Sequence, residues 1–171
     1  MRIELGEWCI RSLTSGDAEA IVRYANNRHI AINLRDRFPH PYTRAAADAF
    51  LAAAASQQPE TDFAIASRSE AIGGIGFHPQ LDVHRLSAEI GYWLGEPFWG
   101  QGIATRAVQA LSEWVFATTP LVRLYAHVFE WNPASARVLE KAGFALEGRL
   151  RRSVLKEGKL IDQLMYGLVR D

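Results

Sequence analysis

Cysteine is scarce in this chain, and long apolar runs are missing. Cys9 is the one cysteine among 171 residues, so no disulfide can form within the chain, which is compatible with a reducing compartment. The first residues, Met-Arg-Ile-Glu, show none of the apolar character of a secretory signal. The longest uninterrupted apolar stretch, residues 49–55, is far too short to cross a bilayer. We therefore expect a cytoplasmic protein that does not enter a membrane.

An excess of charge of either sign is also absent. Lys and Arg together number 19, as do Asp and Glu, which gives a formal net charge of zero. This balance argues against bulk electrostatic binding to nucleic acid or to an anionic membrane. Because 49% of the residues are hydrophobic and 22% are charged, the chain can bury a substantial core. Without repeats or low-complexity linkers, residues 1–171 are expected to form one domain.

The apolar pattern that is present predicts a mixed α/β chain. We expect strands over residues 8–13, 63–67, 71–77, 87–94 and 121–129, and a closing hairpin of 145–155 and 160–169. Helices are expected over 18–24, 43–55 and 103–117 and after Asn132, which can cap a helix with Pro133 in its first turn. Residues 26–42 read as loop or short helix. Since helix 103–117 joins strands 87–94 and 121–129, we expect one parallel pair in a largely antiparallel sheet.

Two glycines stand directly before the helix predicted over residues 103–117. Residues 99–105 read Trp-Gly-Gln-Gly-Ile-Ala-Thr. Glycine has no Cβ, so the backbone can approach a ligand closely. The first N–H groups of a helix lack partners inside the helix, and the helix dipole makes this end positive. The segment therefore suits a phosphate or pyrophosphate, although a glycine turn that only starts a helix is an alternative.

A second motif makes the pattern more specific. Residues 132–144 read Asn-Pro-Ala-Ser-Ala-Arg-Val-Leu-Glu-Lys-Ala-Gly-Phe, and residues 88–94 read Ala-Glu-Ile-Gly-Tyr-Trp-Leu. With residues 99–105, these segments resemble the GNAT acetyltransferase superfamily, and more narrowly its branch of ribosomal-protein N-terminal acetyltransferases. Residues 38–43, Phe-Pro-His-Pro-Tyr-Thr, resemble that branch as well. The resemblance implies the GNAT fold, a mixed and mostly antiparallel sheet of about seven strands with a splayed parallel pair and about four helices.

The resemblance also implies that acetyl-coenzyme A is the acetyl donor. Its thioester arm would enter between the splayed strands, its pyrophosphate would lie on the backbone of residues 101–105, and Asn132 would reach the pantetheine. Arg106, Arg137 or Lys141 would meet the remaining phosphate, although a solvated charge on a helix face is an equal alternative for each. No metal is expected, because His78, His84 and His127 lack metal-ligand spacing. The candidate coenzyme-binding residues are Tyr92, Trp93, Leu94, Gln101, Gly102, Ile103, Ala104, Thr105, Asn132 and Arg137.

Glu89 is the candidate catalytic base. Strand alternation places Glu89, Gly91 and Trp93 on one face of the strand over residues 87–94. A carboxylate in this apolar strand is expected to have a raised pKa and to accept a proton from the amine. The alternative is an ion pair, for instance with an arginine of residues 149–152. A weak base suits a terminal α-amine, with a pKa near 8, better than a lysine amine near 10.4.

The catalytic acid is less apparent. Many GNAT enzymes carry a tyrosine seven residues after the asparagine that corresponds to Asn132, and here that position is Leu139. Ser135 is the substitute candidate, and a plain helix-surface serine is the alternative. Protonation of the coenzyme A thiolate by solvent is a further alternative, because this thiolate is not a very poor leaving group. Tyr92 and Tyr166 read more readily as core aromatics with a polar tip.

On the acceptor side, the family uses the regions that correspond to residues 27–42 and 153–159. Both are basic here, which suits an acidic acceptor or the negative coenzyme, although solvated loop charges explain them equally well. The candidate substrate-binding residues are Phe38, His40 and Tyr42, and Trp93 and Trp131 are further candidates to line the cleft.

The sequence thus predicts acetyl transfer from acetyl-coenzyme A to a primary amine, foremost a protein N-terminal α-amine, by direct attack in a ternary complex. One alternative acceptor is a small amine, such as a polyamine, amino sugar or antibiotic. A non-catalytic acyl-coenzyme A binding module is conceivable because of Leu139. No nucleic acid or membrane partner is expected, and both a monomer and a homodimer are compatible with the sequence.

Overall fold

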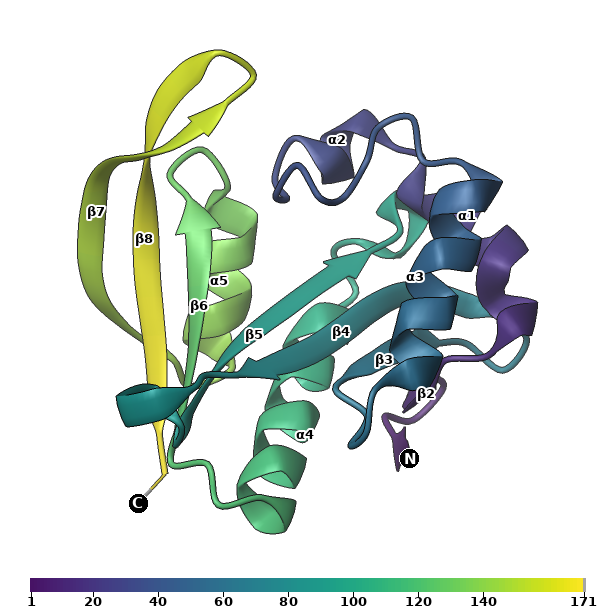
Figure 1. The fold of residues 1–171 in the computed structure, drawn as a ribbon, viewed down its shortest axis with the longest axis horizontal. Helices are drawn as coiled ribbons and strands as arrows, with labels where there is room; N and C mark the ends of the chain where they lie inside the picture. Colours follow the sequence, from purple (N-terminus) through teal and green to yellow (C-terminus); the bar gives the residue numbers. More distant parts are fainter. Residues whose placement is uncertain (171) are drawn as a thin grey trace.

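One mixed sheet organises the molecule. The computed structural model describes residues 1–170, and within them eight strands form a sheet (Figure 1). In spatial order the strands are β1 (Arg2–Glu4), β2 (Cys9–Ser12), β3 (Asp62–Ala66), β4 (Ala71–Pro79), β5 (Ser87–Leu94), β6 (Arg123–Phe129), β8 (Lys159–Val169) and β7 (Ala145–Lys156). Within residues 1–170, β5 and β6 are the only neighbouring strands that run parallel. The predicted fold class is therefore confirmed.

Helices cover both faces of the sheet. The helices are α1 (Ala18–Ala25), α2 (Arg28–Ala31), α3 (Arg44–Ser56), α4 (Ile103–Thr118) and α5 (Pro133–Lys141). Figure 1 shows α1 and α3 in front of β3 and β4, with α4 behind the sheet. In the part of the chain that the structure describes, none of these helices has the length and apolarity needed to cross a membrane.

Strand alternation divides the core between these two layers. Ala88, Ile90 and Leu94 of β5 pack in the main core with the buried face of α4 and α5. Trp93 packs on the other side, against the smaller cluster that α1 and α3 form. The predicted faces of β5 are thus confirmed, and successive residues of this strand serve opposite sides of the sheet.

The elements begin and end close to the predicted residues, with two differences. β1 was not expected, because three residues carry too little pattern, and its pairing with β2 raises the strand number to eight from the expected seven or so. β6 begins at Arg123 rather than at residue 121, because Leu121 is buried before the strand and the N–H of Val122 donates to the carbonyl of Leu86.

The parallel pair separates soon after it forms. β5 and β6 are in register at Ser87–Arg123, Ala88–Leu124 and Glu89–Tyr125, and no later residues of the two strands pair within the described chain. β5 nevertheless stays paired with β4 as far as Leu94, and β6 stays paired with β8 as far as Phe129. Figure 1 shows the two strands diverging upward from this point.

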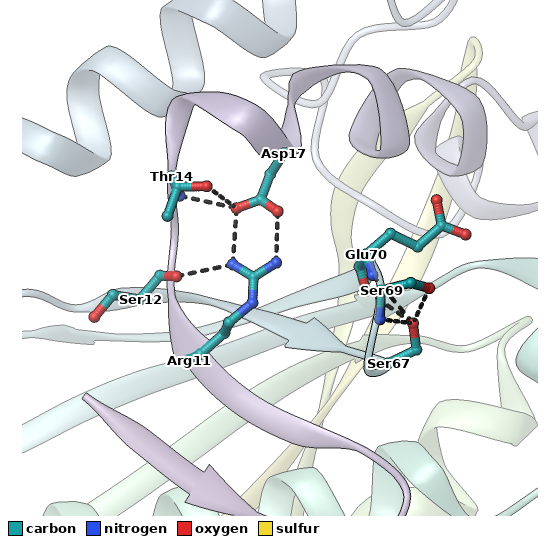
Figure 2. Close-up of polar contacts among 7 residues, drawn as sticks. All are labelled: Arg11, Ser12, Thr14, Asp17, Ser67, Ser69 and Glu70. Carbon is teal, nitrogen blue, oxygen red and sulfur yellow. Dashed lines mark hydrogen bonds and ion pairs between the residues drawn. The ribbon is translucent and has the colours of Figure 1, made fainter.

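An ion pair ties β2 to the start of α1. The Arg11 guanidinium donates to both carboxylate oxygens of Asp17, at 2.9 and 2.6 Å, and the N–H and hydroxyl of Thr14 donate to Asp17 Oδ2 (Figure 2). Burial acts to raise the pKa of the Asp17 carboxyl, but these hydrogen bonds outweigh it and hold the pKa below its usual range. Figure 2 also shows the β3–β4 turn, where the Ser67 hydroxyl accepts from the N–H groups of Ser69 and Glu70.

We predict that Asp17→Asn lowers the free energy of unfolding at pH 7 by roughly 2 kcal/mol, because it removes charge-assisted hydrogen bonds in a buried place. A carboxylate with a lowered folded pKa stabilises the fold above its unfolded pKa, near 3.9, and loses this contribution as the pH falls through the folded pKa. The difference from the wild type should therefore shrink below about pH 4. Urea unfolding at several pH values measures it.

Asp48→Asn is the matched control. Asp48 also accepts a hydrogen bond from an arginine, Arg44, at 2.9 Å, but both side chains are more than half exposed. Its loss should change the unfolding free energy by less than about 0.5 kcal/mol. Equal effects of the two substitutions would contradict the anchoring role of Asp17.

Candidate active site

A cavity of about 1260 Å³ opens where β5 and β6 separate. It reaches both faces of the sheet, with the start of α4 and α5 on one side and the segment between α2 and α3 on the other. Most of the predicted site residues line it, namely Phe38, Tyr42, Glu89, Tyr92, Trp93, Leu94, Gly102, Ile103, Ala104, Thr105, Asn132, Ser135 and Arg137. Gln101 and His40 are not among the lining residues.

The N-terminus of α4 faces this cavity without a side-chain cap. Thr43 caps α3 and Asn132 caps α5 by accepting a backbone N–H, at 3.2 and 3.3 Å. For α4, no side chain of the described residues does so, because Gly102 occupies the N-cap. The first backbone bond of the helix runs from Arg106 N to Gly102 O, at 3.1 Å, so the N–H groups of residues 103–105 stay available to a ligand.

The glycines before α4 give the backbone its shape. Gly100 and Gly102 have φ of 77° and 73°, in the left-handed region that favours glycine. A Cβ at either position would meet no protein atom within 4 Å. These residues thus fit a pyrophosphate, with unpaired N–H groups at the positive end of a 16-residue helix beside open space.

The basic residues near this end divide into two groups. Arg106 turns away, since its guanidinium stacks 4.9 Å from the centre of the Trp8 ring and Arg106 does not line the cavity. Arg137 and Lys141 do line it. Gln101 donates to the carbonyl of Pro97 at 3.3 Å, which leaves only its backbone as a candidate contact.

The free edge of β5 offers backbone groups to the gap. The carbonyl of Ser87 accepts from Gln80 on the β4 side, whereas that of Leu86 accepts from Val122 on the β6 side. Because alternate residues of a strand point their N–H and C=O groups to opposite neighbours, Ile90 and Tyr92 direct theirs toward the gap. These groups suit the amides of a pantetheine arm or a developing oxyanion.

Two hydroxyl groups meet across the gap. The Tyr92 hydroxyl of β5 lies 2.8 Å from Ser135 Oγ of α5, and it also donates to the Ser135 carbonyl at 3.2 Å. Burial raises the pKa of Tyr92 to about 12, so its proton is retained near neutral pH. Tyr92 thus packs against the main core and keeps its hydroxyl hydrogen-bonded, as expected of a core aromatic with a polar tip. Leu139, at the position where the resemblance led us to expect a tyrosine, is wholly buried in the core.

Glu89 has two partners on the opposite face of the sheet. Its Oε1 accepts a hydrogen bond from Arg35 Nη2, in the segment before α3, and lies 3.1 Å from Nδ1 of His127 on β6. Burial acts to raise the pKa of Glu89, but the hydrogen bond with His127 and the charge of Arg35 outweigh burial, and the pKa is lowered. The expected raised pKa is therefore wrong.

The ion pair considered as the alternative for Glu89 does form, but with Arg35 and not with an arginine of residues 149–152. Arg149 pairs with Glu130 and Asp162 instead. The sequence could not show that Arg35, 54 residues earlier, would reach β5. His127 was missed as well, since its spacing to other residues excludes only a role as a metal ligand. A usable signal exists, since His127 stands two residues after Tyr125 and thus shares its face of β6.

The acceptor side of the cavity is aromatic. Phe38 lies 4.9 Å from Tyr42 and 5.7 Å from Trp93, ring centre to ring centre. His40 is exposed outside the cavity, and Trp131 packs edge-on against Phe129 rather than lining the site.

The two basic regions predicted on the acceptor side do meet. Arg28 of α2 pairs with Glu157 of the β7–β8 turn, and Asp36 pairs with Lys156 at the end of β7, each at 2.8 Å. Much of their charge is therefore neutralised within the protein. Among residues 1–170, no group of His, Cys, Asp or Glu side chains is arranged to hold a metal ion.

A profile of the family "Acetyltransferase (GNAT) domain" matches residues 8–145. The chain belongs to the GNAT acetyltransferase family. Enzymes of this family use acetyl-coenzyme A, as the sequence predicted.

Curated relatives agree with this assignment. The "Uncharacterized N-acetyltransferase p20" of Bacillus licheniformis is 40% identical over 101 residues, 59% of this chain and 56% of the relative. The "Ribosomal-protein-serine acetyltransferase" of Escherichia coli is 35% identical over 109 residues, 64% of this chain and 60% of the relative. In both cases the match spans less than two thirds of the relative's own length.

Solved structures share the fold. A RimL ribosomal L7/L12 α-N-protein acetyltransferase in complex with coenzyme A has a TM-score of 0.88 at 22% identity, covering 100% of this chain and 99% of that one. The ribosomal-protein-S5-alanine acetyltransferase of Vibrio fischeri has a TM-score of 0.86 at 23% identity, covering 100% and 97%.

We predict that Gly102→Val weakens coenzyme A binding by about tenfold or more, or ~1.4 kcal/mol. The valine side chain at position 102 would occupy the space beside the N–H groups of residues 103–105. Isothermal titration calorimetry with coenzyme A measures the effect.

Gly158→Val controls for backbone strain. Gly158 has φ of 74°, with an open Cβ position like that of Gly102, but it lies in the β7–β8 turn outside the cavity. Both variants should lose roughly 1–2 kcal/mol of stability, and only Gly102→Val should lose affinity. Normal affinity in a folded Gly102→Val protein would contradict the pyrophosphate assignment.

Proposed function

We propose that this protein transfers the acetyl group of acetyl-coenzyme A to the α-amine of a protein N-terminus. One observation carries the proposal. A single cavity joins the uncapped start of α4 on one face of the sheet to the Glu89–His127 pair on the other, through the gap between β5 and β6. This arrangement lets a coenzyme and an amine approach each other from opposite faces.

The donor side would hold the coenzyme through backbone groups. The N–H groups of residues 103–105 would bind the pyrophosphate, with Arg137 beside it. The backbone of Ile90 and Tyr92 would pair with the pantetheine amides, as an added strand does, and Asn132 would reach the same arm. The coenzyme supplies an acetyl group activated as a thioester.

The chemistry needs a neutral amine and two proton transfers. The amine nitrogen forms a bond to the carbonyl carbon of the thioester, the carbon–sulfur bond breaks, and the sulfur leaves with the electron pair. The nitrogen loses a proton toward the Glu89–His127 pair, and the sulfur gains one. Ser135 is the proposed donor to the sulfur, because its hydroxyl lies beside the gap, 2.8 Å from that of Tyr92, and Ser135 lines the cavity.

An α-amine asks less of the Glu89–His127 pair than a lysine amine does, because more of it is already neutral at pH 7. An α-amine with a pKa near 8 is neutral about one time in ten at pH 7, whereas a lysine amine near 10.4 is neutral roughly once in a few thousand. The name of the Escherichia coli relative, a ribosomal-protein-serine acetyltransferase, supports the same class of acceptor. Such an acceptor would place the protein in the cytoplasm.

Release of free thiol from acetyl-coenzyme A tests the proposal. The acceptors offered are N-terminal peptides with blocked lysines, lysine peptides with blocked N-termini, and small amines such as a polyamine or an amino sugar. We expect turnover with the first group. Turnover with small amines alone would replace the proposed acceptor class, and coenzyme binding without transfer to any amine would overturn the proposed activity.

We predict that Gly91→Val blocks the acceptor while it spares the coenzyme. Gly91 shares its face of β5 with Glu89, lines the cavity and leaves its Cβ position open, so a valine fits the strand and extends into the acceptor side. The kcat/KM for the peptide should fall on the order of 10²-fold, because a small misplacement of a reactant commonly costs that much in rate. The affinity for coenzyme A should be nearly unchanged.

Gly148→Val is the matched control for this substitution. Gly148 is also a strand glycine, with an open Cβ position and ordinary φ, but it lies on β7 outside the cavity. It should behave like the wild type in steady-state kinetics. An equal loss in both variants would argue against an acceptor site beside Gly91.

A further inference from the structure

We infer that the imidazole of His127 accepts the proton of the attacking amine, and that Glu89, held by Arg35, positions this imidazole. The inference rests on the proposed acetyl transfer and assigns its base.

His127 lies where the two parallel strands have just separated. Tyr125 is the last residue of β6 that pairs with β5, opposite Glu89, and His127 is the next residue on the same face. Its side chain is 17% exposed and lines the cavity. The imidazole therefore stands on the acceptor side of the gap, beside the route by which an amine would meet the thioester.

The hydrogen bond with Glu89 fixes the tautomer of the ring. Nδ1 of His127 lies 3.1 Å from Glu89 Oε1. Since an ionised carboxylate only accepts hydrogen bonds, Nδ1 must carry the proton, and in the neutral ring Nε2 then carries the lone pair. Within residues 1–170, Glu89 is the hydrogen-bond partner that the structure gives His127. Nε2 thus stays available to take a proton.

Glu89 is held in its ionised form. The same Oε1 accepts from Arg35 and from His127, and the pKa of Glu89 is lowered. A proton on Glu89 would leave the Arg35 guanidinium beside a neutral acid. A carboxylate bound in this way orients a histidine well, because it accepts a hydrogen bond from one ring nitrogen and fixes the direction of the other. The same carboxylate is a weak base.

Other titratable groups surround the pair and must be separated from it in a pH profile. β4 contributes His78, paired in register with Glu89, and β3 contributes Asp62, 4.0 Å from His78. Tyr125 of β6 lies 5.5 Å from the His127 ring, centre to centre. On the β8 side His127 faces Met165, which carries no charge.

The proposed step is balanced. The amine nitrogen bonds to the carbonyl carbon and passes one proton to Nε2 of His127, while the sulfur leaves with its electron pair and takes a proton from Ser135 or from solvent. His127 then returns its proton to solvent, and Ser135, where it is the donor, regains a proton from solvent. The products are an N-acetyl amide and the free thiol.

The ranking of two variants tests the assignment. We expect His127→Gln to lower kcat by about 10²-fold or more, the usual contribution of a general base, with coenzyme A affinity unchanged. Glu89→Gln should lower kcat less than His127→Gln does, because the amide oxygen of Gln can still accept from Nδ1. His84→Gln, an exposed histidine of the β4–β5 loop outside the cavity, is the control and should match the wild type.

The pH profile and chemical rescue distinguish a base from a structural residue. The fall of kcat toward acid pH should become shallower in His127→Gln, where only protonation of the amine remains, and should persist as in the wild type in Glu89→Gln. Added imidazole should restore part of the kcat of His127→Ala, in proportion to its neutral form. An unchanged acid limb in His127→Gln, or a greater loss in Glu89→Gln, would overturn the inference. A wild type that acetylates no amine would overturn the proposed function itself.

Discussion

The separation of β5 from β6 after the Glu89–Tyr125 pair is the constraint on which the site depends. Neighbouring strands of a sheet normally satisfy each other's backbone, and here a parallel pair stops doing so in the middle of the sheet. Each strand keeps its outer partner, β4 or β8, along its remaining length. The gap therefore weakens neither side of the sheet, and it leaves inner N–H and C=O groups for a ligand.

The same separation explains how one site serves two reactants. Because side chains alternate along a strand, Tyr92 reaches Ser135 on the face covered by α5, while Glu89 and His127 meet on the opposite face. The proposed proton donor and the proposed proton acceptor thus lie on different sides of the sheet. The uncapped start of α4 lies in the same cavity, where in the proposed mechanism it would orient the coenzyme toward the amine.

The sequence predicted those features that depend on local patterns. The glycines before α4, the Asn132 cap and the alternation of β5 follow from short-range rules, and the structure agrees with each. The pairings of Glu89 did not follow, because Arg35 and His127 lie 54 and 38 residues away and meet it only through the topology. The lowered pKa of Glu89 was missed for the same reason. The apolar residues around Glu89 in the strand indicated burial, whereas the partners that outweigh burial are distant in sequence.

A crystal structure of the protein with acetyl-coenzyme A tests the central claim most directly. The account predicts the diphosphate within hydrogen-bond distance of the N–H groups of residues 103–105, and the pantetheine between β5 and β6 beside Ile90 and Tyr92. A diphosphate bound elsewhere would contradict the account, and so would strands β5 and β6 that pair along their whole length with no pantetheine between them.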